Sequence, residues 1–294
     1  MSKKMQTIRK SLSVVLAPAV YSLGRALNRP DVAASSVKYD QYYLRGYLEL
    51  LRINNRSAEV VTPLVTAALL CASVPNEGGK LIKDLVSISH SQLVQDIVCV
   101  LVSEQKREGY FVEVGVGDGE TLSNTLLLER DFGWRGILAE PADRFGSAIR
   151  GKRKAVLDTR AVTARSGDTL VFEEDVYLGE LSGLAGVREP RGDQTLRKYQ
   201  VKTVTMDDLL DEHGAPECID YISIDTEGSE LQVLEGLSLN RRRVGLFTIE
   251  HNLNLEKIAA IRRKLIPLGY RQIFAGISNF DIWFVHNDVS SRYI

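Results

Sequence analysis

Residues 109–125 read GYFVEVGVGDGETLSNT, and they carry the most information about the architecture of the chain. Its first part, 110–114, is aromatic and β-branched, which is typical of a buried strand. Three glycines follow at alternate positions, Gly115, Gly117 and Gly119, and they permit a sharp turn and a close approach to a ligand. A helical pattern resumes afterwards. A strand, a glycine turn and a helix start predict a cofactor site at the carboxyl edge of an open α/β sheet.

The spacing of the glycines indicates which cofactor binds. A dinucleotide loop follows the pattern G-x-G-x-x-G, whose last glycine would fall where this chain has Glu120. Here the third glycine comes one residue earlier, and an acid, Glu113, precedes the first glycine by two residues. The pattern resembles the first motif of class I S-adenosylmethionine-dependent methyltransferases. A carboxylate suits this cofactor, because S-adenosylmethionine carries an ammonium and a sulfonium.

Composition places the chain among ordinary globular proteins. Its 294 residues, 44% of them hydrophobic, can bury a full core. Basic and acidic side chains nearly balance, 37 against 38, so no nucleic-acid partner is expected, and short basic clusters such as 150–154 are interpreted as solvated surface. Three scattered cysteines, Cys71, Cys99 and Cys218, argue against a disulfide framework and suit a reducing compartment. We therefore expect a cytoplasmic enzyme.

The N-terminal region carries a separate signal. Residues 1–30 hold six Lys or Arg and no acid, which resembles a signal peptide and equally suits a basic helix in peripheral contact with a membrane. Helical apolar spacing follows over 39–53 and 60–73. We predict that residues 1–84 form a helical cap or oligomerisation segment, and that residues 85–294 form the cofactor-binding domain. A homo-oligomer is one use of such a segment.

Beyond the glycine loop, strand and helix patterns alternate, as they do in parallel α/β sheets. Glu140 ends the second strand 25 residues after Gly115, close to the spacing at which an acid holds ribose hydroxyls. Asp225 ends the central strand, and Glu250-His251 ends the next one, beside the crevice where open sheets bind ligands. We expect strands over 136–139, 154–157, 169–172, 201–204, 219–224, 244–249, 270–274 and 281–285, the last two antiparallel. Helices are expected over 89–106 with Ser89 as N-cap, over 122–129, after Thr205 as N-cap, and over 255–267. We also expect a break at 75–79 and a substrate-covering loop over 181–200.

Six runs resemble, in this order, the FkbM family of methyltransferases: SQLVQD, GYFVEVGVGDGETLSNT, GWRGILAEP, TMDDLLDE, IDYISIDTEGSELQVLEG and IEHN. The resemblance covers about residues 89–286 and departs at Val116-Gly117, where the family more often has alanine and asparagine. It implies an α/β fold with a class I methyltransferase Rossmann-like sheet, mostly parallel with an antiparallel last strand, here joined to a helical N-terminal segment. It also implies S-adenosylmethionine-dependent methylation of a hydroxyl on a sugar, glycan or natural product.

The resemblance carries over a set of site residues by position. An acceptor hydroxyl has a pKa far above neutral, so its methylation calls for a base or a polarising group. We predict His251 as the base, with Asp225 and Glu250 beside it. Asp225, Glu227 and Glu250 could instead gather a divalent cation, but no tight ligand spacing is visible and no metal is expected. The implied cofactor-binding residues are Glu113, Gly115, Gly117, Asp118, Gly119, Glu140 and Asp225.

Two other functions stay open. A binding or regulatory protein would keep the fold without turnover, although the complete set of acids and glycines argues against it. A nicotinamide-dependent oxidoreductase would use a similar sheet, although the early third glycine disfavours it. The acceptor itself is not visible in the sequence, because acceptor pockets are built from caps and loops such as 1–84 and 164–200.

Overall fold

The structure, a computed structural model, describes residues 58–188 and 195–294. The basic segment 1–30 and the predicted helix 39–53 lie outside these residues. Within the described ranges, no helix is both long enough and apolar enough to cross a membrane.

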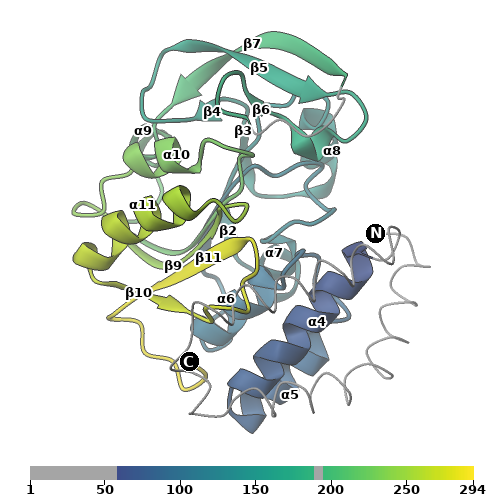
Figure 1. The fold of residues 1–294 in the computed structure, drawn as a ribbon, viewed down its shortest axis with the longest axis vertical. Helices are drawn as coiled ribbons and strands as arrows, with labels where there is room; N and C mark the ends of the chain where they lie inside the picture. Colours follow the sequence, from purple (N-terminus) through teal and green to yellow (C-terminus); the bar gives the residue numbers. More distant parts are fainter. Residues whose placement is uncertain (1–57, 189–194) are drawn as a thin grey trace.

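A mixed sheet forms the centre of the described part of the chain (Figure 1), with seven strands in the order β10-β11-β9-β8-β1-β2-β3. Neighbours from β3 to β9 pair in parallel, whereas β11 runs antiparallel to both β9 and β10. The predicted Rossmann-like sheet with an antiparallel last strand is therefore confirmed. The strands are β1 (Tyr110–Val114), β2 (Arg135–Ala139), β3 (Val156–Asp158), β8 (Cys218–Ile224), β9 (Arg243–Glu250), β10 (Tyr270–Ile273) and β11 (Asp281–His286).

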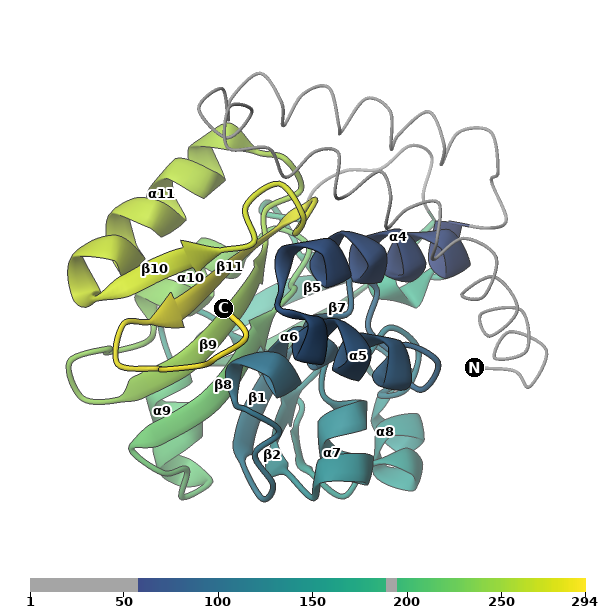
Figure 2. The same ribbon diagram turned by 90° about the horizontal axis from the view of Figure 1, so that it is seen from below.

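Helices cover both faces of this sheet, so its strands are apolar on both sides. Alternate residues of β1 show the division: Phe111 packs with α6, whereas Val112 packs with α9, α10 and α11. Figure 2 shows α9, α10 and α11 on one face and α5, α6, α7 and α8 on the other. The helices are α4 (Ala58–Ser73), α5 (Asn76–Leu85), α6 (Gln95–Val102), α7 (Leu126–Phe132), α8 (Gly146–Lys152), α9 (Met206–Glu212), α10 (Glu230–Glu235) and α11 (Leu255–Leu265).

The strand order reverses between β1 and β8. From β1 the chain first builds outward through β2 and β3, and later builds in the opposite direction through β8, β9 and β11. In open α/β sheets, the crevice outside the carboxyl ends of the strands at such a point binds ligands. The topology therefore places the candidate site at the ends of β1 and β8.

The described N-terminal helices share a core with α6. Leu70 on α4 and Ile82 on α5 are fully buried in the cluster that includes α6. The predicted break at 75–79 is confirmed at Pro75, which separates α4 from α5, but it is shorter than expected, because α5 begins at Asn76 and contains Gly78. A Cβ on Gly78 would lie 3.1 Å from Tyr293, so the glycine lets the helix pack closely against the C-terminal segment. The division of the chain at residue 84 stays a prediction.

Two predicted helices begin later than expected, for the same reason. Val94 has a left-handed backbone, with φ of 57°, so α6 begins at Gln95 and not near Ser89. Leu122 is also left-handed, with φ of 58°, and α7 begins at Leu126. Ser89 is not an N-cap, since its hydroxyl donates instead to Asp96. Both connections are compact turns that the helical pattern did not reveal.

A second sheet, in the order β4-β7-β5-β6, lies beyond the β3 side of the main sheet (Figure 1). Its core is an antiparallel pair of β5 (Thr169–Asp175) and β7 (Leu196–Val204). The predicted strand 169–172 is confirmed and extends further, whereas the predicted loop 181–200 is wrong at its end, which belongs to β7. Between them come the short helix η1 (Gly179–Leu181) and β6 (Gly183–Leu184), while β4 (Ala161–Val162) joins the sheet to β3.

Candidate active site

A cavity of about 470 Å³ opens at the carboxyl edge of the main sheet. Four of its lining residues stand at the ends of neighbouring parallel strands: Gly115 after β1, Glu140 after β2, Asp225 after β8 and Glu250 ending β9. The second sheet supplies the opposite wall through Phe172 and residues 179–184. The volume is that of a small-molecule site, which ranges from about 300 to 1,000 Å³.

The glycine loop passes close to the end of β8. Gly115 has φ of +81°, and a Cβ built on it would lie 1.6 Å from the carbonyl oxygen of Asp225. No residue with a side chain fits there without moving the backbone. Gly117 also has a positive φ of +58°, and both glycines line the cavity. The loop therefore presents bare backbone to a ligand, as a cofactor cradle requires.

Glu140 fastens this loop to β2. Its Oε2 accepts hydrogen bonds from the backbone N–H groups of Val116 and Gly117, each at 2.8 Å, and its Oε1 accepts one from Ala142. Burial raises the pKa of Glu140, and the three N–H groups act in the opposite direction. The carboxyl lies in the cavity wall, where a ribose diol would be met. Its role as ribose ligand stays a prediction.

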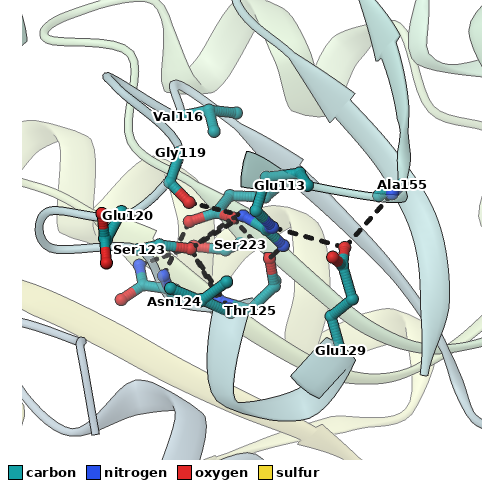
Figure 3. A network of polar contacts seen from close by, with 12 residues as sticks. Glu113, Val116, Gly119, Glu120, Ser123, Asn124, Thr125, Glu129, Ala155 and Ser223 are labelled. Atoms are coloured by element: carbon teal, nitrogen blue, oxygen red, sulfur yellow. Dashed lines mark hydrogen bonds and ion pairs between the residues drawn. The ribbon is translucent and has the colours of Figure 1, made fainter. Parts of the chain in front are cut away.

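Glu113 holds the segment that follows the loop (Figure 3). Its Oε1 accepts from the N–H of Asn124, and its Oε2 accepts from the hydroxyls of Ser123 and Thr125. The side chain is buried, and Arg153 Nη1 lies 3.6 Å from Oε2. Glu113 thus lines the cavity while its oxygens organise the backbone that leads into α7.

Arg153 is a site-supporting residue that sequence reasoning missed. The cluster 150–154 was interpreted as solvated surface, but the Arg153 side chain is fully buried. It donates to Ser123 and Thr125 and forms an ion pair with Glu129. No feature of the local sequence separates Arg153 from its basic neighbours, since its role arises from contacts with α7 and the glycine loop.

Asp118 and Gly119 belong to the loop but not to the described residues that line the cavity. Asp118 accepts from the N–H groups of Glu120 and Thr121 and pairs with Lys152 at 2.8 Å. Although burial raises the pKa of Asp118, the hydrogen bond from Lys152 and those from the backbone lower it overall. Its role is to shape the loop. The structure does not place Asp118 against a ligand.

His251 does not reach the cavity. Its Nδ1 accepts from the N–H of Leu253 at 2.9 Å, and its Nε2 lies 2.9 Å from the carbonyl oxygen of Asp281, to which it donates. Burial lowers the pKa of His251 to about 4. Because both ring nitrogens are engaged by the backbone, the geometry gives the predicted base no support. The turn responsible, with Asn252 and Leu253 left-handed, was not visible in the sequence.

Carboxyl groups gather at the ends of β8 and β9. Asp225, Glu230 and Glu250 each offer an oxygen, and these oxygens all lie within 4.8 Å of one another. Glu230, the first residue of α10, accepts hydrogen bonds from Thr226 N–H and from Lys257 Nζ, the latter at 2.7 Å. Burial raises the pKa of Glu250 well above its ordinary value, and Asp225 is the next cause. The cavity is therefore acidic on this side.

Buried polar atoms without a hydrogen-bond partner among the described residues are available to a ligand. Three of them belong to cavity-lining side chains: Asn124 Oδ1, Glu250 Oε2 and Asn252 Nδ2. Unpaired buried polar groups cost free energy, about 1–3 kcal/mol each, unless something binds them. The bare glycine backbone and these free donors and acceptors together suit a polar small molecule such as S-adenosylmethionine and its acceptor.

Comparison with known proteins identifies a family over the same residues. Residues 113–272, more than half of the chain, match the family model described as the methyltransferase FkbM domain. No curated protein matches the chain.

Similar solved structures are distant. The human methyltransferase 10 domain containing protein is 12% identical, with a TM-score of 0.34, covering 66% of this chain and 82% of that one. The METTL16 methyltransferase domain is 16% identical, with a TM-score of 0.37, covering 76% of this chain and 80% of that one. The N-terminal domain of human METTL16 is 15% identical, with a TM-score of 0.35 and coverages of 76% and 82%.

Proposed function

Since the chain belongs to the FkbM methyltransferase family, we propose that it transfers a methyl group from S-adenosylmethionine to a hydroxyl oxygen of a sugar, glycan or natural product. Family and fold imply S-adenosylmethionine as the cofactor. The observation that carries the proposal is the cavity itself, where the glycine loop, Glu140 and the carboxyls of Asp225 and Glu250 meet at one edge of the sheet.

The β1–β2 side of the cavity is the cofactor half. The backbone at Gly115 and Gly117 would lie along the amino-acid part of the cofactor, and Glu140 would hold the ribose hydroxyls. When bound, S-adenosylmethionine supplies an electrophilic methyl group. The chain contributes position, since alignment of the acceptor oxygen with that methyl group is a large part of what transfer requires.

The β8–β9 side is the acceptor half. Glu250 Oε2 has no hydrogen-bond partner among the described residues and lines the cavity, so it is available to an acceptor hydroxyl. Burial raises the pKa of Glu250, which makes its ionised form a stronger proton acceptor. Glu250 with Asp225 therefore replaces His251 as the group that faces the acceptor. Asn124 and Asn252 add polar atoms that favour a hydroxyl-rich molecule.

The test begins with binding. Calorimetry of the full chain with S-adenosylmethionine and, separately, with NAD should show binding of the former alone. An acceptor screen by mass spectrometry, with detection of the mass gain of one methyl group, then identifies the substrate. Failure to bind S-adenosylmethionine contradicts the proposal, and binding without transfer to any hydroxyl compound favours the non-catalytic alternative.

A further inference from the structure

We propose that Asp225, Glu230 and Glu250 form a binding site for a divalent cation, Mg²⁺ or Mn²⁺, in the acceptor half of the cavity. Binding of the cation stands on the geometry alone. Its use, to hold an acceptor hydroxyl, rests on the function proposed above.

The first argument is charge. Three carboxyl groups, those of Asp225, Glu230 and Glu250, lie within 4.8 Å of one another, and one buried ammonium, that of Lys257, pairs with Glu230 among the described residues. His251, on the same turn, is neutral and directed toward the backbone. A buried excess of negative charge must be neutralised by protons or by a bound cation. A further buried carboxyl, that of Glu227, lines the same cavity.

The second argument is a buried carboxylate oxygen that lacks a hydrogen-bond partner among the described residues. Glu250 is only 5% exposed, its Oε2 has no partner among the described residues, and it lines the cavity next to Asp225. Asn124, which is 7% exposed, has an equally unpaired Oδ1 in the same cavity. Both atoms are acceptors, so what they lack is a donor or a positive charge. Hard cations such as Mg²⁺ bind carboxylate and amide oxygens of this kind.

The third argument is that the ligands are held in place. β8 and β9 pair in parallel up to Ile224 and Ile249, so Asp225 and Glu250 leave their strands side by side. Glu230 is fixed by the turn before α10, whose Gly228 has φ of +136°. A Cβ on Gly228 would lie 2.2 Å from the carbonyl oxygen of Val187, so this turn packs closely against the backbone of the second sheet's connection. Such fixed oxygens can bind a cation without paying for their own ordering.

The ion pair of Lys257 with Glu230 determines which of the three carboxyls are the main ligands of the cation. Its ammonium lies 2.7 Å from Glu230 Oε2, and Glu230 Oε1 accepts from the backbone at Thr226 and Gly228. Asp225 and Glu250 are therefore the principal ligands, and Glu230 adds a remaining lone pair and its charge. Mg²⁺ commonly keeps several waters, so two or three protein oxygens are enough, and the open positions are available to water or a hydroxyl.

The experiment measures the cation without the cofactor. The full chain, freed of metal by a chelator and dialysed, is titrated with Mn²⁺, and free Mn²⁺ is followed by electron paramagnetic resonance. We expect one site, with affinity lowered at least tenfold in Glu250→Gln and in Asp225→Asn. Glu235→Gln, an exposed acid at the end of α10, is the matched control and should leave the affinity unchanged.

Each outcome decides the proposal. Absence of a Mn²⁺ site in the wild-type chain overturns it, as does equal weakening by Glu235→Gln. Circular dichroism checks folding, and the two ligand variants make the result independent of either one alone. Calorimetry with S-adenosylmethionine is carried out in parallel. If cofactor binding and methyl transfer persist after the chelator treatment, only the cation's role in catalysis is overturned. If Mn²⁺ binds but S-adenosylmethionine does not, the cation site stands and the proposed function is contradicted.

Discussion

Gly115 shows how a single residue controls the site. It turns the chain out of β1 with φ of +81° and lies directly against the backbone that follows β8. Gly133, at the end of α7, has a similar φ of +70°, but no described atom lies within 4 Å of the Cβ that it would carry. Substitution of each glycine by alanine therefore distinguishes two contributions to the loss of stability: the strain of a left-handed backbone, present at both positions, and a steric clash, present only at Gly115.

Gly133→Ala should cost only the left-handed backbone, about 1–2 kcal/mol of unfolding free energy. Gly115→Ala should cost about 3–5 kcal/mol, because overpacking against the carbonyl of Asp225 is added. Urea denaturation of both variants measures the difference. Equal losses would show that the loop moves freely away from β8, contrary to the cradle described above.

Glu140→Ala should weaken S-adenosylmethionine binding by about 1.5–3 kcal/mol, the range for hydrogen bonds to charged groups. The variant loses the proposed ribose ligand and also frees the N–H groups of Val116 and Gly117. Calorimetry measures the affinity. Glu120→Ala is the control, since Glu120 belongs to the same loop and is not among the described residues lining the cavity. An unchanged affinity in folded Glu140→Ala would rule out the assignment.

At the scale of elements, the connection between β9 and α11 makes stability depend on pH. The pKa of His251 is lowered from 6.5 to about 4 in the folded chain. Between these values the unfolded chain binds more protons, so the stability that His251 contributes is full above pH 6.5 and is lost as the pH falls through 4. From pH 7 to 4.5 the wild type should lose about 2 kcal/mol more than His251→Gln.

Urea denaturation of both proteins at pH 7 and at pH 4.5 measures this difference in stability. The dependence of the catalytic rate on pH tests whether His251 also takes part in the reaction. If His251 supports the fold, its replacement should leave the position of the inflections in that profile unchanged. Disappearance of an inflection between pH 6 and 7, together with a loss of about 10²–10⁴ in rate, would restore His251 as the base.

The elements of the main sheet could be predicted, because strands buried on both faces form apolar runs that end in recognisable polar residues. Gly115, Glu140, Asp225 and Glu250 were visible for this reason. The first half of β7, residues 196–200, was missed, since its exposed positions carry Arg197 and Lys198 in a sequence that looks like a charged loop, whereas a strand over 201–204 was expected. Arg153, Glu230 and both hydrogen bonds of His251 depend on tertiary contacts, which local patterns do not contain.

At the scale of the whole molecule, α4 and α5 pack with α6 on the opposite side of the described structure from the second sheet (Figure 1). A chain that begins at Leu85 loses Leu70 and Ile82 and exposes the face of α6 that they cover. It should still bind S-adenosylmethionine, because every cofactor motif follows residue 110, while becoming less stable and losing activity or changing its assembly.

Light scattering after gel filtration reports the assembly, and calorimetry reports cofactor binding. A chain that begins at Ala58, which retains α4 and α5, is the control for removal of residues 1–57. If the shorter chain keeps the stability, turnover and assembly of this control, the role predicted for residues 58–84 is wrong.

The pairing of β4 with β7 places the two ends of the second sheet next to each other. Val162 pairs with Val204, so the chain leaves the β3 edge and returns to it at one point before α9. The segment between them builds one wall of the cavity through Phe172 and residues 179–184, and the main sheet does not pass through it. Under the proposed function it is therefore a cassette: recombination, or a protein engineer, can exchange it as one piece to retune the choice of acceptor, so long as the replacement keeps the contact of Val187 with the turn at Gly228.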